Sequence, residues 1–362
     1  MNGLIRSAAR AGLRAYSVGF NRRVRARFLV REITAYPLAF TPPRLSDPQV
    51  ESALSTYAGH QYREWIYDLR EPCYVEPSGG FVFGSRGEWL RDPFLYHQLV
   101  RHPPYRNILA LMRRRGGIQT FERALSLRCS TEQNYWHFYD DVLSKLRLAD
   151  EVKVPEDVPI LVGDGLWRQA FFQDAIRRGA LRRRNWVLQD AFVRVHRLIL
   201  TVPMSFQRAN LEYALRALET PGPVRSERRL FLRRGQRRSR SLVNIDDLLP
   251  WLIERGFEVV DTDGLSLAAQ MELFGAARLV VGNHGAGLAN LVYRVGQPLD
   301  LVEVFSPGFI RPHFVCMAQM FGFGYDAVVG TAAGDEGDFR LDPDRFKDVV
   351  SRAMGRIRSS SG

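Results

Sequence analysis

The sequence predicts an α/β protein whose C-terminal half forms a parallel, doubly wound sheet. From residue 228 onward, short apolar runs alternate with segments of helical periodicity, joined by short turns, and this pattern is typical of parallel strands linked by helices. The composition is 46% hydrophobic and 25% charged, an ordinary globular balance. A length of 362 residues favours two medium-sized domains over one.

The N-terminal segment is strongly basic. Its first 31 residues hold eight arginines and no acidic residue, and Arg6, Arg10 and Arg14 recur every four residues, so they would share one face of a helix. The apolar run is too short and interrupted for a secretory signal. An interfacial helix drawn to anionic lipid and a solvated basic arm both fit this pattern. The sequence contains no run of about 18 apolar residues, so we predict no transmembrane helix.

Residues 41–224 are expected to form the N-terminal domain. The turn-rich TPPRLSDP (41–48) separates it from a basic arm at residues 1–40, and PGPV (221–224) marks its end. Helical spacing of apolar residues predicts a helix over 130–149, capped by Ser130 or Thr131. The other elements expected here are strands around 81–83, at 158–164 and at 194–203, and a helix over 167–179.

Residues 225–350 are expected to form the C-terminal domain, followed by a loose tail at 351–362. Asn244 and Ser266 stand where helix caps are expected, and Gly256 follows a predicted helix. The expected strands are 228–234, 257–261, 278–281 and 299–305, and the expected helices are 244–256, 266–277, one beginning at 285 and one beginning at 311.

The net charge indicates which kinds of molecule the protein binds, and the cysteines indicate its redox environment. The net charge of +12 and a pI of about 10.0 favour anionic partners such as phosphates, nucleotides, acidic glycans or a lipid surface. The first 31 residues supply +8, which leaves +4 for the remainder, and no nucleic-acid-binding motif is present, so no nucleic acid is expected. The three cysteines are widely separated, which predicts no metal site and a reducing compartment.

The stretch RLVVGNHGAGLANLVY (278–293) is the most informative motif. It predicts a buried strand, a glycine-rich loop and the start of a helix, where the amides of Gly285, Ala286 and Gly287 would form an anion site. His284 would donate to a phosphoryl oxygen or a leaving group. The spacing is neither that of a dinucleotide fingerprint nor that of a Walker loop. Taken alone, the loop is equally consistent with a tight strand-to-helix turn.

Two neighbouring strands strengthen the phosphate interpretation. Arg233 and Arg234 end the first strand of this half, and Glu303 lies near the end of the strand after the motif. In a parallel sheet these features lie along one edge. A cation for a diphosphate, an amide cradle and a carboxylate for ribose hydroxyls would make a nucleotide-diphosphate site. A surface ion pair for Arg233 and a satisfied buried carboxylate for Glu303 remain the alternatives.

The motifs together resemble glycosyltransferase family 61, including bacterial capsular-polysaccharide-type members. The similar segments are GGFVFG (79–84), NYWHFYDDVL (134–143), LFLRRG (230–235), RSLVN (240–244), residues 256–293 and LVEVF (301–305). The resemblance implies two Rossmann-like domains facing a cleft (the GT-B arrangement), a nucleotide-sugar donor in the C-terminal domain, and inversion without an obligatory metal. Ile245 and Asn283 depart from the pattern, where glutamate and proline are common.

The resemblance also implies roles for individual residues. Arg233 corresponds to the diphosphate arginine, the loop from His284 to Gly287 to the phosphate loop, and Glu303 to the ribose ligand. It places the helix bearing Asn134, His137, Asp140 and Asp141 at the interdomain cleft.

An inverting transfer needs a base for the acceptor hydroxyl. His137 and Asp141 are four residues apart and share a helix face. Asp141 is the hypothesised base, with His137 orienting either Asp141 or the acceptor. The reverse assignment, and an ion pair between Asp141 and an arginine, remain open.

The expected function is transfer of a sugar from a nucleoside-diphosphate donor, UDP-sugar above all, to a glycan or lipid-linked acceptor in surface polysaccharide synthesis. No cofactor and no metal are expected. The expected location is cytoplasmic, at the inner face of the membrane through Arg6 to Arg31. The alternative is a non-catalytic relative that keeps the fold and binds a nucleotide sugar or a glycan.

Overall fold

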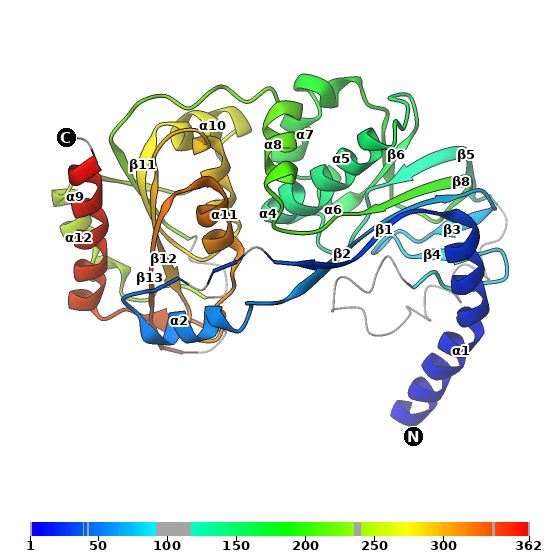
Figure 1. The fold of residues 1–362 in the computed structure, drawn as a ribbon, viewed down its shortest axis with the longest axis horizontal. Coiled ribbons are helices and arrows are strands. Elements are labelled where there is room, and N and C mark those ends of the chain that lie inside the picture. The colour runs from blue at the N-terminus through cyan, green and yellow to red at the C-terminus, as the bar shows by residue number, and fades with distance from the viewer. Residues whose placement is uncertain are drawn as a thin grey trace. The chain divides into compact units, whose positions relative to one another are not determined.

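The computed structural model describes residues 2–38, 40–41, 43–91, 117–234, 240–334 and 337–360. The chain divides into two compact units (Figure 1). The N-terminal unit comprises residues 1–36 and 61–218, and the C-terminal unit comprises residues 37–60 and 219–362. Each unit contains its own α/β sheet, which confirms the predicted α/β class.

The sheet of the C-terminal unit is wholly parallel, as predicted. Its strands are β9 (Arg228–Leu232), β10 (Phe257–Val260), β11 (Ala277–Asn283), β12 (Asp300–Phe305) and β13 (Gly324–Val329). They lie in the order β10-β9-β11-β12-β13, and every neighbouring pair is parallel. The chain winds outward in both directions from between β9 and β11, and ligands of doubly wound sheets bind at such a switch point.

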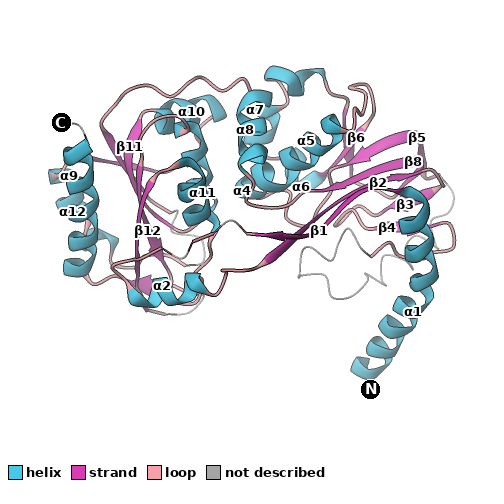
Figure 2. Ribbon diagram, viewed as in Figure 1, coloured by secondary structure: helices cyan, strands magenta, loops and turns pink. Residues whose placement is uncertain are grey.

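Helices cover both faces of this sheet. The helical elements of the unit are α2 (Pro48–Ser55), η4 (Ile245–Asp247), α9 (Leu249–Glu254), α10 (Leu267–Gly275), η5 (Ala286–Arg294), α11 (His313–Phe321) and α12 (Pro343–Ser360). Figures 1 and 2 show α9 and α12 on one face and α10 and α11 on the other. Phe346 and Val349 of α12 are buried against Val302 and Val304. A short hairpin of β14 (Thr331–Ala332) and β15 (Phe339–Arg340) completes the unit.

Some of the predicted helix caps and ends in the C-terminal unit are confirmed and others are wrong. The Ser266 side chain accepts from the amide of Ala269, as expected of a cap. The expected cap at Asn244 is wrong, because its side chain bonds the amide and carbonyl of Leu341 instead. The expected loose tail at 351–362 is helical as far as Ser360, since buried Ala353 and Ile357 continue the apolar face of α12.

Residues 37–60 pack with the C-terminal unit, although the sequence placed residues 41–60 in the N-terminal domain. Asp47 is fully buried and caps α2, accepting from the amides of Gln49 and Val50. Its second oxygen accepts from the amide of Val329 at 2.8 Å and pairs with Arg345 at 2.7 Å. These bonds attach the segment to β13.

The sheet of the N-terminal unit is mixed. Its strands are β1 (Leu29–Pro37), β2 (Gln61–Leu69), β3 (Cys73–Val75), β4 (Val82–Gly84), β5 (Gln119–Ser126), β6 (Ile160–Gly163), β7 (Trp186–Gln189) and β8 (Val193–Val202). The main path is β1-β2-β8-β5-β6-β7. Strands β5 to β8 are mutually parallel, whereas β2 and β3 are antiparallel to β8. The N-terminal sheet therefore combines a parallel part, β8-β5-β6-β7, with antiparallel strands on the side of β2.

The N-terminal unit also contains several helical elements. They are α1 (Asn2–Phe28), α4 (Tyr135–His137), η2 (Phe138–Leu143), α5 (Ser144–Glu151), α6 (Asp164–Trp167), α7 (Ala170–Ala175), η3 (Gly179–Arg183) and α8 (Arg208–Ala217). The helix predicted over 130–149 therefore begins at Tyr135, and Asn134 caps it by accepting from the amides of Trp136 and His137. Its middle turns, η2, form a π-helix, which often marks a functional site.

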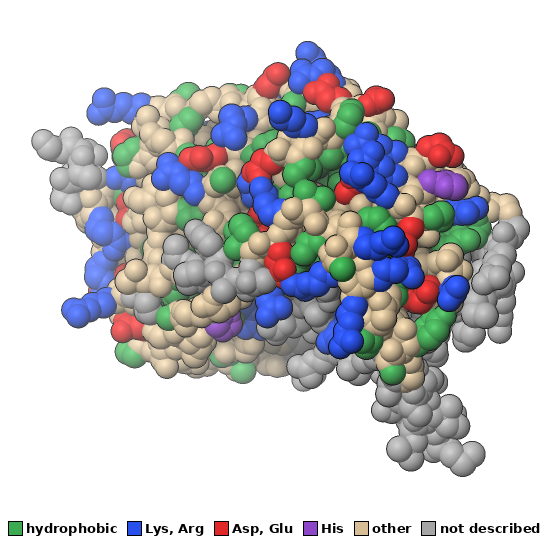
Figure 3. All heavy atoms as spheres, turned by 45° about the vertical axis from the view of Figure 1, so that its right-hand side comes forward, with side chains coloured by type: hydrophobic (Ala, Val, Ile, Leu, Met, Phe, Trp, Pro, Cys, Tyr) green, Lys and Arg blue, Asp and Glu red, His purple; other side chains and the backbone are tan. Residues whose placement is uncertain are grey.

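The segment expected to be a basic arm contains α1 followed by strand β1 of the sheet, and the C-terminal end of α1 packs on that sheet. Phe20 and Val24 of α1 are buried against the core of the N-terminal unit, while Arg22 and Arg27 remain exposed. The side chains of Arg6, Arg10 and Arg14 lie outside the described residues. Basic side chains are dispersed among acidic ones over the face shown in Figure 3. Within the described ranges, no helix is long and apolar enough to cross a membrane.

Candidate active site

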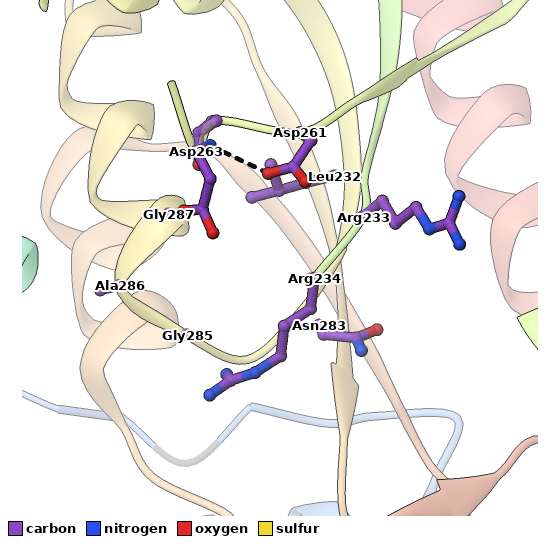
Figure 4. A pocket seen from close by; sticks show the side chains of 10 residues that line it. Leu232, Arg233, Arg234, Asp261, Asp263, Asn283, Gly285, Ala286 and Gly287 are labelled. Atoms are coloured by element: carbon purple, nitrogen blue, oxygen red, sulfur yellow. Dashed lines mark hydrogen bonds between the residues drawn. The ribbon is translucent and has the colours of Figure 1, made fainter. Parts of the chain in front are cut away.

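A pocket opens at the carboxyl ends of β9, β10 and β11 in the C-terminal unit (Figure 4). This is the edge at which open parallel sheets bind ligands. The lining residues are Leu232, Arg233, Arg234, Asp261, Thr262, Asp263, Asn283, Gly285, Ala286 and Gly287. The pocket therefore contains the glycine loop, Arg233 and Arg234, together with two carboxylates, Asp261 and Asp263, which were assigned no role from the sequence.

The glycine loop is shaped by close contacts that leave no room for side chains. A Cβ on Gly282 would lie 2.9 Å from the Cβ of Leu232, and one on Gly287 would lie 3.1 Å from a methyl of the same leucine. A Cβ on Gly285 would lie 2.8 Å from Nη1 of Arg234. The loop leads into η5, a 3₁₀ helix, whose first internal bond runs from the amide of Leu288 to Gly285. The amides of residues 285–287 precede that bond, and first-turn amides lack helical acceptors.

Arg233 and Arg234 point in different directions. The guanidinium of Arg234 reaches beneath the glycine loop, and its Nη1 donates to the carbonyl of His284 at 3.2 Å. Figure 4 shows the side chain of Arg233 extending away from that loop. Arg234 is therefore the arginine that adds positive charge next to the loop amides.

His284 and Glu303 meet, as their positions at one sheet edge implied, but neither residue lines the pocket. Nδ1 of His284 is 2.5 Å from Oε1 of Glu303, and the hydroxyl of Tyr325 donates to Oε2 at 2.7 Å. His284 is 7% exposed and Glu303 is fully buried. The imidazole also stacks on Phe305, with ring centroids 5.2 Å apart. Glu303 holds the histidine in place in this arrangement rather than facing the pocket.

Burial controls the protonation of this pair. Burial, followed by the charges of Arg240, Arg234 and Arg311, lowers the pKa of His284 to about 3. Burial raises the pKa of Glu303 to about 8, against a smaller opposing effect of the Tyr325 hydrogen bond. Both shifts favour uncharged side chains. At neutral pH these shifts favour a protonated Glu303 beside a neutral imidazole, so the pair carries no net charge.

Asp261 and Asp263 form the acidic side of the pocket. The amide of Asp263 donates to Oδ1 of Asp261 at 2.9 Å, so the turn after β10 fixes both positions. Both residues are exposed at the same sheet edge as the glycine loop. Sequence analysis assigned them no role, although the signal was present: FEVVD ends in an acid, and β10 adjoins the strand carrying Arg233 and Arg234.

The N-terminal unit holds the second predicted group, on α4 and η2. Nδ1 of His137 lies 2.6 Å from Oδ2 of Asp141, which confirms that the two residues share a helix face. The His137 side chain is 27% exposed, but that of Asp141 is only 4% exposed. The imidazole is therefore the member of the pair that a substrate can reach.

Asp140 faces elsewhere, as its helix position implied. Its Oδ1 accepts from the amide of Phe206 at 3.0 Å. Burial and the charge of Asp141 raise the pKa of Asp140 to about 7. Phe206 has φ of +57°, an uncommon backbone conformation for a bulky residue, and it packs on Trp136 with ring centroids 6.3 Å apart. Asp140 thus stabilises a strained turn beside His137.

The pKa of His137 follows from its neighbours. Burial is the largest influence and lowers it, but the hydrogen bond and charge of Asp141, with the charge of Asp140, outweigh burial and raise the pKa of His137. A carboxylate that bonds one imidazole nitrogen fixes the tautomer and orients the other nitrogen. In the part of the chain that the structure describes, no group of three or more metal-ligating side chains occurs.

The C-terminal unit thus has a pocket lined by the glycine loop and two arginines, and the N-terminal unit has a partly exposed histidine–aspartate pair. Residues 135–298 match the family model described as Glycosyltransferase 61. The match begins in the helix of His137 and Asp141 and includes the glycine loop, and it supports a glycosyltransferase of this family. No curated protein matches the chain.

Proposed function

We propose that the protein is an inverting glycosyltransferase that uses a nucleoside-diphosphate sugar, with UDP-sugar as the expected donor. The observation that carries the proposal is the pocket in which loop amides, Arg234 and Asp261 converge at one sheet edge, within the segment matched to the family. Helix N-terminal amides and an arginine bind phosphate oxygens, and a carboxylate accepts from ribose hydroxyls.

The donor roles are distributed over the pocket as follows. The amides of residues 285–287 and the guanidinium of Arg234 hold the diphosphate, with Arg233 at the rim of the pocket. Asp261 takes the ribose contact that the sequence assigned to Glu303, because Asp261 is exposed in the pocket and Glu303 is fully buried. Glu303 instead positions His284, whose backbone begins the loop.

The sequence analysis named Asp141 as the base, but the exposed fractions of His137 and Asp141 favour the reverse assignment. His137 is the partly exposed member, so we assign it as the base that contacts the acceptor hydroxyl, and Asp141 orients it. The imidazole takes the hydroxyl proton while the acceptor oxygen forms a bond to the anomeric carbon. The bond from that carbon to the phosphate oxygen breaks, and the nucleoside diphosphate leaves with the electron pair.

The leaving diphosphate gains negative charge, which must be stabilised in the transition state. In the proposed reaction the loop amides and Arg234 contact the leaving diphosphate, so protein groups stabilise this charge. We therefore propose that the transfer proceeds without an obligatory metal ion. Retention of activity in excess EDTA would support this part, and full loss that Mg²⁺ or Mn²⁺ restores would contradict it.

The proposed setting is the synthesis of a surface polysaccharide, on a glycan or lipid-linked acceptor. Exposed Arg22 and Arg27 on α1 support contact with an anionic membrane, since basic helix faces are attracted to such surfaces. The proposal places the enzyme in the cytoplasm, at the inner face of the membrane.

A panel of nucleotide sugars with matched glycan acceptors tests the proposed function. We expect product from one donor, with the anomeric configuration inverted as judged by NMR coupling constants. Tight donor binding with neither transfer nor donor hydrolysis would support the non-catalytic relative instead. Product with retained configuration would refute the single-displacement mechanism.

A further inference from the structure

Two arginines converge on one aromatic ring beyond β12. The guanidinium carbons of Arg240 and Arg311 lie 4.0 Å and 4.6 Å from the ring centroid of Phe309. The ring of Phe309 also contacts His284, with centroids 5.4 Å apart. This cluster therefore adjoins the residue that begins the glycine loop, but it lies outside the lining of the pocket.

No carboxylate neutralises the two guanidinium groups within the ranges that the structure describes. By contrast, Arg228 and Arg255 of the same unit each pair with a glutamate. Nη1 of Arg240 is buried, and among the residues that the structure describes it has no hydrogen-bond partner. Burial and the charge of Arg311 lower the pKa of Arg240, which is the direction expected of a partly buried cation held close to a second one.

The backbone holds Arg240 in a strained conformation. Its φ is +67°, in the left-handed region that residues with a Cβ rarely adopt. The next residue is fixed on both sides, because the amide of Ser241 donates to Asp338 at 2.7 Å and its carbonyl accepts from Phe339 at 3.0 Å. Strain of this kind persists where the surrounding structure imposes it, and it is concentrated at functional sites.

We propose that Arg240 and Arg311, supported by Phe309, form a second anion subsite that binds a phosphoryl group beside the glycine loop. The planar guanidinium donates in pairs to phosphate oxygens, and stacking on an aromatic ring leaves its donor edge available. The phosphoryl group belongs either to the donor diphosphate or to a separate phosphate-bearing acceptor. The identity of the ligand rests on the proposed function, whereas the presence of an anion site does not.

The test is calorimetric titration of the full chain with inorganic pyrophosphate, UDP and uridine. We expect wild-type protein to bind pyrophosphate, and Arg240→Gln and Arg311→Gln each to weaken that binding about tenfold, since hydrogen bonds to charged groups are worth about 1.5–3 kcal/mol. Arg255→Gln is the matched control. Its guanidinium lies 4.1 Å from the Trp251 ring, but at the opposite, amino-terminal edge of β10.

The outcomes separate the two sources of the phosphoryl group. A parallel loss for UDP and pyrophosphate assigns the subsite to the donor, and a loss for pyrophosphate alone assigns it to another substrate. Arg311→Lys keeps the positive charge and serves as a second variant if Arg311→Gln does not fold. Thermal unfolding of each variant checks that it is folded. The proposed subsite is refuted if both glutamine variants bind pyrophosphate as tightly as wild type, or if the wild-type protein does not bind pyrophosphate. Pyrophosphate binding without sugar transfer would refute the proposed function and leave the subsite standing.

Discussion

At the scale of single residues, exposure decides which of two neighbouring groups can do chemistry. The sequence predicted that His137 and Asp141 share a face, and their 2.6 Å contact confirms it. Spacing carries no information on depth, however, so it could not show that Asp141 is buried and His137 partly exposed. For Glu303, likewise, the sequence predicted its position at the edge of the sheet but could not show that its side chain is fully buried.

Replacement of Asp141 by asparagine tests the dyad. The amide keeps the shape but lacks the negative charge that stabilises the imidazolium, so we expect transfer to fall by about 10²–10⁴-fold with donor affinity retained. His137→Ala should give a loss of similar size. Asp164→Asn is the control, because Asp164 is an exposed residue paired with Arg168 on the same unit. A near wild-type rate in Asp141→Asn would remove the dyad from the mechanism.

The raised pKa of Glu303 makes stability depend on pH. A carboxyl whose folded pKa of about 8 exceeds its usual 4.5 contributes stability that is fully present below about pH 4.5 and is lost as the pH rises through 8. His284 acts in the opposite direction, since a pKa lowered from 6.5 to about 3 removes stability as the pH falls below 6.5. The pair therefore favours folding most between about pH 4.5 and 6.5.

Glu303→Gln isolates this effect. Between pH 6.5 and 8 the wild-type chain should lose about 2 kcal/mol of unfolding free energy through this group, and the glutamine variant should not. Urea unfolding at both pH values measures the difference. Identical pH slopes in the two proteins would show that Glu303 is ionised in the fold.

At the scale of elements, the C-terminal sheet was predictable because each parallel strand is a continuous apolar run followed directly by a helix. The mixed sheet of the N-terminal unit was not. Its strands β2 and β8 pair between residues such as Trp65 and Val202, and no local pattern records a partner so distant in the chain. The 3₁₀ form of η5 was also missed, since its apolar spacing is compatible with an α-helix.

Substitutions at two glycines of the loop are expected to affect nucleotide binding and protein stability differently. A methyl at Gly285 meets the flexible end of Arg234, so Gly285→Ala should displace that guanidinium and weaken nucleotide binding with little change in stability. A methyl at Gly282 meets the Cβ of Leu232, which cannot move independently of the strand, so Gly282→Ala should cost about 1–3 kcal/mol. Thermal unfolding and calorimetry check both. Equal loss of stability in the two variants would contradict the contrast.

At the scale of the whole molecule, the chain does not divide where its composition suggests. TPPRLSDP has the turn-rich composition of a linker, but Asp47 within it is buried and bonded to Val329 and Arg345. Its burial depends on residues about 280 positions away, which the sequence pattern could not reveal. Residues 37–60 are therefore part of the C-terminal unit.

Asp47→Ala tests this attachment. The substitution removes the cap of α2 and leaves the Val329 amide without its acceptor, so we expect a loss of about 2–4 kcal/mol in unfolding free energy. Asp344→Ala is the control, since the Asp344 side chain is 99% exposed. A change below about 0.5 kcal/mol in Asp47→Ala, as is usual for surface substitutions, would show that the segment is a simple linker.

The central claim is that the carboxyl edge of the C-terminal sheet binds the nucleoside diphosphate of a sugar donor. Calorimetric titration of UDP, GDP and CMP into wild type, Arg234→Gln and Arg233→Gln tests it most directly. We predict that one diphosphate binds wild type and that Arg234→Gln weakens it about tenfold or more, with a smaller effect of Arg233→Gln, because only Arg234 reaches the loop. Equal diphosphate affinity in all three proteins would contradict the claim.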